Sequence, residues 1–184
     1  MPVLRDFLRR RIVGNMPKLV SYPYDGRIPK EDKLKREVAR HLKKADHVIA
    51  LTDVYTGSND FCDAEDAKNK MARWVGNEGR FHAHAALYEF EAWLIPFWED
   101  IQRLAGSDRG PPKNSPERIN HGKPPSKLLA EVFNAGSKRK CYSKSETPRR
   151  ILMNKDLGLA AAACPELKAF LNTLLTLSGG QALD

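Results

Sequence analysis

The sequence of 184 residues has the length of one domain that can bury a sizeable core. With 41% hydrophobic and 29% charged residues, its composition is typical of a globular protein in water, and no apolar run approaches the roughly 20 residues of a membrane span. The net charge of +8 is unevenly distributed, with +7 in residues 1–50, −6 in 51–100 and +7 in 101–184. An acidic centre between basic flanks suits a protein that holds cations centrally and polyanions around them, although basic stretches are also common on solvated surfaces.

The N-terminus predicts an amphipathic helix, because Val3, Leu4, Phe7 and Leu8 recur at helical spacing without the apolar core of a secretion signal. We therefore expect a cytoplasmic protein. The cysteines are odd in number and widely spaced, which favours neither a disulfide framework nor a zinc site. We expect them to be reduced and to take no part in chemistry: Cys62, Cys141 and Cys164.

The first half of the chain alternates helices and strands. After a helix over residues 3–12, the pattern predicts a strand at 18–22, a helix at 30–44, a strand at 47–52, a helix at 63–75 and a strand at 80–87. Such alternation implies crossover connections and a mostly parallel sheet flanked by helices. Since the pattern begins with a helix, the first strand of such a fold is missing from it.

The second half is predicted to be helical. Gly, Pro, Ser and Asn residues make 106–126 a long surface loop, and helices are expected at 127–135, 148–160 and 164–175. We expect a single α/β domain, with a core over about residues 1–105 and a loop and helical C-terminal extension over 106–184.

Asp53 directly follows an apolar run of strand length. In open α/β sheets ligands bind beyond the carboxyl ends of the strands, so Asp53 is the first candidate site residue. Carboxylates that gather there repel one another unless a cation joins them, and Mg²⁺ prefers oxygen ligands. Further acids crowd the next loop and helix start, where the helix dipole alone also favours them: Asp60, Asp63, Glu65 and Asp66.

Glu89 and Glu91 stand within an aromatic and aliphatic stretch, Leu87–Ile95. Because burying a lone carboxylate is costly, each must meet a cation, a hydrogen-bond network or solvent. If the strand continues, both point to one face; if a helix begins, they diverge and one faces water. We predict that at least one of them belongs to a metal or catalytic site. His82 and His84 alternate just before, but no third ligand stands at a supporting spacing, which favours packing or hydrogen bonding over zinc.

The segment 138–144 interleaves cations with an aromatic residue, a mixture that suits phosphate contacts and base stacking. A flexible solvated loop explains the same composition. The residues that we expect to contact nucleic acid are Lys138, Arg139, Lys140, Tyr142 and Lys144.

Several motifs resemble those of a bacterial family described as domain of unknown function family 4276. The most specific is the paired-glutamate segment Leu87-Tyr88-Glu89-Phe90-Glu91-Ala92-Trp93-Leu94, accompanied by 51–57 and Asn59-Asp60-Phe61. Further matches, over roughly residues 45–177, are Ser115-Pro116-Glu117-Arg118-Ile119-Asn120, Pro125-Ser126-Lys127, Tyr142-Ser143-Lys144 and Cys164-Pro165-Glu166-Leu167.

The resemblance implies a three-layer Toprim-like fold, related to the metal-dependent domains of topoisomerases, primases and OLD-type nucleases. It implies that Asp53 ends the third Toprim strand, that Glu89 and Glu91 lie beyond the fourth, and that Lys127 and Lys144 lie near the phosphate. It also implies a setting beside ABC-type ATPases in mobile or phage-defence gene clusters.

Two features depart from the Toprim pattern. The glutamate expected at the end of a first strand would precede Met1 or has been lost. The usual Asp-x-Asp is Asp53-Val54-Tyr55, so a further metal ligand must come from Asp60 or Glu89.

The leading hypothesis is a Mg²⁺- or Mn²⁺-dependent nuclease-like protein that acts on DNA or RNA. Its expected metal ligands are Asp53, Glu89, Glu91 and Asp60, with Lys127 also in the catalytic set. One alternative is a catalytically inactive Toprim-like subunit that docks on an ABC-type ATPase. Another is a phosphatase or phosphotransfer enzyme acting on small molecules, and the sequence leaves a homodimer open.

Overall fold

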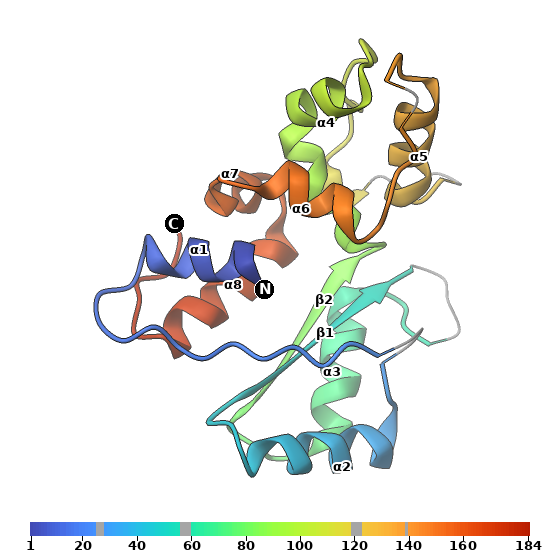
Figure 1. The fold of residues 1–184 in the computed structure, drawn as a ribbon. Coiled ribbons are helices and arrows are strands. Elements are labelled where there is room, and N and C mark those ends of the chain that lie inside the picture. Colours follow the sequence, from blue (N-terminus) through green and yellow to red (C-terminus); the bar gives the residue numbers. More distant parts are fainter. Residues whose placement is uncertain (25–27, 56–59, 119–122, 139) are drawn as a thin grey trace.

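The computed structural model describes residues 1–24, 28–55, 60–118, 123–138 and 140–184. These residues form a mixed α/β protein with eight α-helices, two 3-10 helices and a two-stranded parallel sheet (Figure 1). The elements are α1 (Pro2–Arg9), α2 (Glu31–Leu42), β1 (Val48–Val54), α3 (Ala64–Val75), β2 (Phe81–Leu87), η1 (Phe90–Phe97), α4 (Trp98–Ala105), η2 (Pro116–Arg118), α5 (Pro125–Ala135), α6 (Glu146–Leu152), α7 (Leu157–Ala163) and α8 (Pro165–Leu177).

The sheet consists of two of the predicted strands, joined by the predicted helical crossover. Strands β1 and β2 pair in parallel, from Val48 opposite Phe81 to Val54 opposite Leu87, and α3 connects them. Neighbouring residues on β2 point to opposite faces. Ala85 accordingly packs with α2 and α3, whereas Ala86 packs with the helices of the other half of the molecule.

The strand predicted at residues 18–22 is wrong. This segment has no strand pairing, and its side chains at Val20 and Tyr22 remain exposed. β-Branched and aromatic residues favour strands mainly because a sheet buries their side chains, and in this segment those side chains stay exposed. The sheet of the described residues is smaller than the mostly parallel sheet expected from the sequence.

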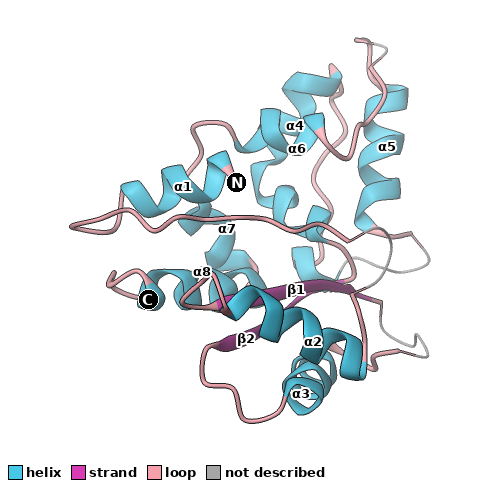
Figure 2. Cartoon of the chain, turned by 60° about the horizontal axis from the view of Figure 1, so that its bottom comes forward, coloured by secondary structure: helices cyan, strands magenta, loops and turns pink. Residues whose placement is uncertain are grey.

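Two hydrophobic cores meet at the sheet. The smaller core joins α2, α3 and one face of the sheet, with Met71 and Val54 fully buried in it. The larger core joins η1 to helices α1 and α4 to α8. Figures 1 and 2 show α4, α5 and α6 grouped beyond one end of the sheet, on the opposite side of the molecule from α2 and α3.

The helix predicted over 148–160 is two helices, α6 and α7. The first helix ends at Leu152, Met153 is extended, and Asn154 then adopts a left-handed backbone conformation with φ 62°. The Asp156 carboxylate then accepts a hydrogen bond from the Gly158 backbone N–H and begins the second. Both residue types are among those best suited to these positions.

The remaining predicted helices are confirmed with small changes at their ends. Helix α5 begins at Pro125, because proline suits the first turn of a helix, where its missing N–H is not needed. Among the described residues, no helix combines the length and the apolar character needed to cross a membrane.

Candidate functional site

Asp53 lies near the end of β1, opposite Ala86 of β2. Its Oδ1 atom accepts a hydrogen bond from the backbone N–H of Phe90, at 3.1 Å. The carboxyl of β1 is thereby joined to the start of η1, the short helix that follows β2. This contact places the first candidate acid beside the paired-glutamate segment.

Glu89 is buried and its carboxylate is fully engaged. The Tyr55 hydroxyl donates to Oε1 at 2.6 Å, and the Ser126 backbone N–H donates to Oε2 at 2.7 Å. Ser126 belongs to the first turn of α5, where free N–H groups and the helix dipole favour a negative charge. Burial opposes ionisation of Glu89, but these donors together with Lys144 outweigh it and hold the pKa below its ordinary value.

Glu91 has no exposed surface. Its Oε1 atom accepts a hydrogen bond from the Tyr142 hydroxyl at 3.1 Å, while Oε2 has no hydrogen-bond partner among the described residues. Burial raises the pKa of Glu91, the ammonium of Lys144 opposes this rise, and the charge on Glu89 adds to it. An unpaired carboxylate oxygen in the interior is costly, so its presence needs an explanation.

Lys144 is the cation that faces these acids. Its Nζ atom lies 3.3 Å from Glu89 Oε1 and 3.7 Å from Glu91 Oε1, although 62% of the side chain is exposed. Partial burial would lower the pKa of the ammonium, but Glu91, Glu89 and Asp53 raise it above its ordinary value. With all four groups ionised, three carboxylates face one ammonium and the cluster carries an excess of two negative charges.

The pKa of Asp53 is raised by burial and by this excess of negative charge. It is raised from 3.8 to about 6, first by loss of hydration within the surrounding protein and then by the charge on Glu91. The Phe90 N–H and Lys144 oppose the rise, and Glu89 adds to it. Asp53 keeps exposed surface, so the cluster opens to solvent at this residue.

The donor set of this carboxylate cluster, Asp53, Glu89 and Glu91, is suited to a hard divalent cation. Its oxygen ligands, its uncompensated charge and the unpaired Glu91 Oε2 all favour one. As arranged in the structure, no three His, Cys, Asp or Glu side chains of the described residues are grouped to hold a metal ion. Lys144 stands between the acids instead, so a metal ion would have to replace or displace its ammonium.

A family model described as domain of unknown function (DUF4276) matches residues 1–175. The chain belongs to the DUF4276 family. It matches no curated protein and no solved structure. The family assignment agrees with the resemblance of the paired-glutamate segment, and that segment forms the buried part of the cluster in this DUF4276 chain.

Not every acid and lysine predicted from the sequence reaches the cluster. Asp60 forms an ion pair with Lys30, and its backbone carbonyl accepts a hydrogen bond from Lys70. Lys127 is exposed on α5, one residue after Ser126, and its side chain has no hydrogen bond or ion pair with any described residue.

The predicted nucleic-acid segment divides into two parts. Tyr142 and Lys144 contact the buried glutamates. Lys138 instead donates a hydrogen bond to the Arg103 backbone carbonyl at 2.6 Å, and Lys140 is exposed. The prediction for Arg139 lies outside the described residues.

Two groups that donate hydrogen bonds to Glu89 were not predicted. Tyr55 stands two residues after Asp53 on an extended segment, so the alternation of a strand could have placed its hydroxyl beside the same acids. A contact through the backbone N–H of Ser126 does not depend on its side chain, so the sequence does not reveal it. Only the preceding Pro125 indicates that a helix begins there.

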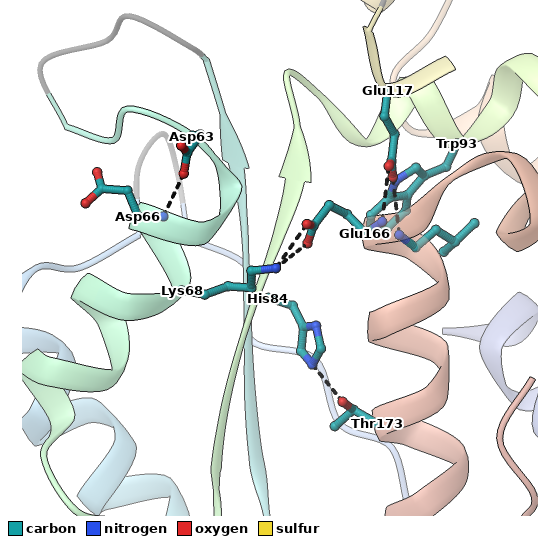
Figure 3. Close-up of polar contacts among 9 residues, drawn as sticks. Asp63, Asp66, Lys68, His84, Trp93, Glu117, Glu166 and Thr173 are labelled. Atoms are coloured by element: carbon teal, nitrogen blue, oxygen red, sulfur yellow. Dashed lines mark hydrogen bonds and ion pairs between the residues drawn. The ribbon is translucent and has the colours of Figure 1, made fainter. Parts of the chain in front are cut away.

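Glu117 and His84 are buried polar residues that stabilise the fold (Figure 3). Glu117 accepts hydrogen bonds from the Trp93 indole at 2.8 Å and from the first backbone N–H groups of α8, those of Glu166 and Leu167. His84 contacts the Thr173 hydroxyl of α8 at 3.0 Å through Nε2. Both side chains therefore attach α8 to the rest of the molecule.

Proposed function

We propose that this protein is a Mg²⁺- or Mn²⁺-dependent phosphodiester hydrolase of the nuclease type, with a Toprim-like active site. The observation that carries the proposal is the convergence of Asp53, Glu89 and Glu91, which are separated by up to 38 positions in the numbering, on one lysine. These acids lie at or just beyond the carboxyl ends of two parallel strands, and in α/β folds ligands bind at such strand ends. The buried Oε2 atom of Glu91, which has no hydrogen-bond partner among the described residues, supports a role for this oxygen as a metal ligand.

The residues of the cluster have distinct parts in this proposal. A divalent cation bound there would activate water and shield the charge of the phosphate. Asp53 and Glu91 are the favoured ligands, because Glu89 is already held by Tyr55 and Ser126. Lys144, whose side chain is largely exposed, is free to turn toward a phosphate oxygen once the acids bind a cation.

A nucleic acid is the favoured substrate because of the charge around the site. In the sequence the acidic centre lies between two flanks of +7 each. Lys127 and Lys140 are exposed, and they lie close in the sequence to Ser126 and Lys144, which contact Glu89. Lysine side chains on such a surface replace the counterions of a phosphate backbone. A role in phage defence, beside an ABC-type ATPase, is the setting that the family resemblance suggests.

The test combines metal binding with cleavage. Calorimetric titration with Mn²⁺ should show one class of site in the wild-type protein, and cleavage of labelled single-stranded DNA, duplex DNA or RNA should require the metal. Asp53→Asn and Glu91→Gln should lose both properties. Glu65→Gln, which removes an exposed acid of α3, should retain them. Metal-free cleavage, or cleavage that survives in Asp53→Asn and Glu91→Gln, would refute the proposal.

A second candidate is a non-catalytic Toprim-like subunit that binds an ABC-type ATPase. It is favoured by the complete hydrogen bonding of Glu89 and by the ammonium of Lys144 among the acids, an arrangement that stabilises a fold without a metal. A folded wild-type protein that neither binds Mn²⁺ nor cleaves any nucleic acid would support this candidate. Hydrolysis of a small phosphomonoester without cleavage of nucleic acid would instead indicate a phosphatase.

A further inference from the structure

Tyr88, the residue that precedes Glu89 of the carboxylate cluster, lines an open groove of about 660 Å³. It begins where β2 ends and is bordered by the loop that leads into η2. This volume is within the range of ligand sites in proteins, roughly 300–1,000 Å³. The residues that line it, called here the β2 groove, are Leu87, Tyr88, Lys113, Asn114, Ser115, Glu117 and Arg118.

The β2 groove has two cationic side chains and one carboxylate in its lining, and therefore an excess of positive charge. Lys113 and Arg118 are exposed, and neither side chain forms an ion pair or hydrogen bond with any described residue. The carboxylate in the lining, Glu117, forms no ion pair with either cation, since its oxygens accept hydrogen bonds from Trp93 and the start of α8 in the interior. The groove therefore favours an anionic ligand.

The β2 groove and the carboxylate cluster are joined through one peptide bond. Tyr88 lines the groove, and the next residue, Glu89, sends its carboxylate to Tyr55, Ser126 and Lys144. Tyr88 has a left-handed φ of 67°, which is uncommon for a residue with a side chain and turns the chain sharply between β2 and η1. Consecutive Cα atoms are about 3.8 Å apart, so the groove begins one residue before Glu89.

We propose that the β2 groove is a nucleotide subsite. Lys113 and Arg118 bind a phosphate group, since an ammonium and a guanidinium are the common phosphate-binding cations of proteins. Tyr88 offers an aromatic ring for base stacking, and Asn114 and Ser115 offer hydrogen-bond donors and acceptors to the sugar or base edge. The inference rests on the proposed function for the place of this nucleotide in the substrate, which is next to the phosphodiester held at the cluster.

The test measures binding of the full chain in EDTA, so that no metal and no cleavage are needed. The probe is a 5′-fluorescein-labelled single-stranded octanucleotide, followed by fluorescence anisotropy. Lys113→Ala and Arg118→Ala should each weaken binding about tenfold and reduce the dependence of log affinity on log salt by about 0.7. Arg73→Ala removes the same charge from an exposed position on α3 and should leave both quantities unchanged.

Two further measurements test the stacking on Tyr88 and the chemical class of the ligand. Tyr88→Phe should bind the octanucleotide like wild type, whereas Tyr88→Leu should bind several-fold more weakly. Adenosine monophosphate should displace the probe at lower concentration than inorganic phosphate does. Equal competition by inorganic phosphate would overturn a nucleotide subsite, because the groove would then bind only an anion.

Failure of this inference can be separated from failure of the proposed function. Wild-type cleavage together with unchanged binding by Lys113→Ala and Arg118→Ala would overturn the subsite and leave the proposed function standing. Binding that depends on both cations, in a protein that cleaves nothing with Mn²⁺, would support the subsite as a nucleotide site and remove the proposed function. Asp53→Asn should retain octanucleotide binding in EDTA while it loses cleavage.

Discussion

Replacing Asp53 by asparagine should make the metal-free protein more stable at neutral pH. The amide has nearly the shape of the carboxyl group, and its oxygen can keep the hydrogen bond from the Phe90 N–H. What the substitution removes is a negative charge that faces Glu91 and Glu89. That charge is partly desolvated and is repelled by the neighbouring carboxylates, so it should lower the stability of the folded protein when no cation is bound.

The magnitude follows from the pKa of about 6, against the ordinary value of 3.8. At about 1.36 kcal/mol per pH unit, ionising Asp53 costs the folded state at most about 3 kcal/mol. Because Asp53 keeps exposed surface, solvent screening reduces this to about 1–2 kcal/mol. A raised carboxyl pKa means that the folded protein binds the proton more tightly than the unfolded chain, so this group lowers stability as pH rises from about 4 to about 6. Above pH 6 the cost stays constant.

The assay is urea unfolding of wild type and Asp53→Asn in EDTA at pH 7.5 and pH 4. We expect the variant to be about 1–2 kcal/mol more stable at pH 7.5, with the difference largely gone at pH 4, where the folded wild type is protonated at Asp53. Glu65→Gln, on the exposed face of α3, should show no such difference. Equal or lower stability of Asp53→Asn at pH 7.5 would refute the reasoning, as would a gain that is the same at both pH values.

Three further changes test other parts of the structure. Lys144→Ala should raise the pKa of Asp53 above 6, since it removes the ammonium that opposes the rise; carbon-13 NMR of the carboxyl measures this, and an unchanged pKa would contradict the ion-pair geometry. Glu117→Gln should cost about 1–3 kcal/mol in urea unfolding, because an amide cannot accept all three hydrogen bonds that the carboxylate accepts. Burial, then Lys68 and His82, lower the pKa of His84 to about 4. In the unfolded chain His84 takes up a proton near pH 6.5, whereas in the folded protein it does so only near pH 4. The free energy of unfolding should therefore fall by up to about 3 kcal/mol as the pH is lowered from 6.5 to 4. His84→Asn should reduce this dependence on pH in urea unfolding, and an unchanged dependence would contradict the burial of His84.

Periodicity and strand-end position were enough to predict much of the fold. The helices over 30–44 and 63–75 were predicted because their apolar residues recur at helical spacing, and α2 and α3 confirm them. The strands at 47–52 and 80–87 were visible as compact apolar runs, and they pair in parallel across α3. Residues 18–22 had a similar composition but no partner to pack against, and composition alone does not report partners.

The convergence of Glu89 and Glu91 could not be derived from the sequence. Both alternatives considered, a continuing strand or a new helix, assumed regular geometry. The structure instead has a left-handed residue at Tyr88, an extended Glu89 and a 3-10 helix that contains Glu91. Only this irregular path brings the two carboxylates to Lys144, which is more than fifty positions away in the chain. Their metal-binding role stays a prediction, as does that of Asp60, which the structure pairs with Lys30.

The attachment of α8 has a practical consequence for anyone who shortens this protein. Glu117 satisfies its carboxylate largely with two N–H groups of that helix, and Lys68 of α3 bridges to Glu166 at its start (Figure 3). A fragment that stops before Pro165 would leave Glu117 with the Trp93 indole alone and expose the apolar side of β2 that carries Ala86. Deletion of the last helix should therefore yield an insoluble or partly folded product, although the helix contributes no residue to the carboxylate cluster.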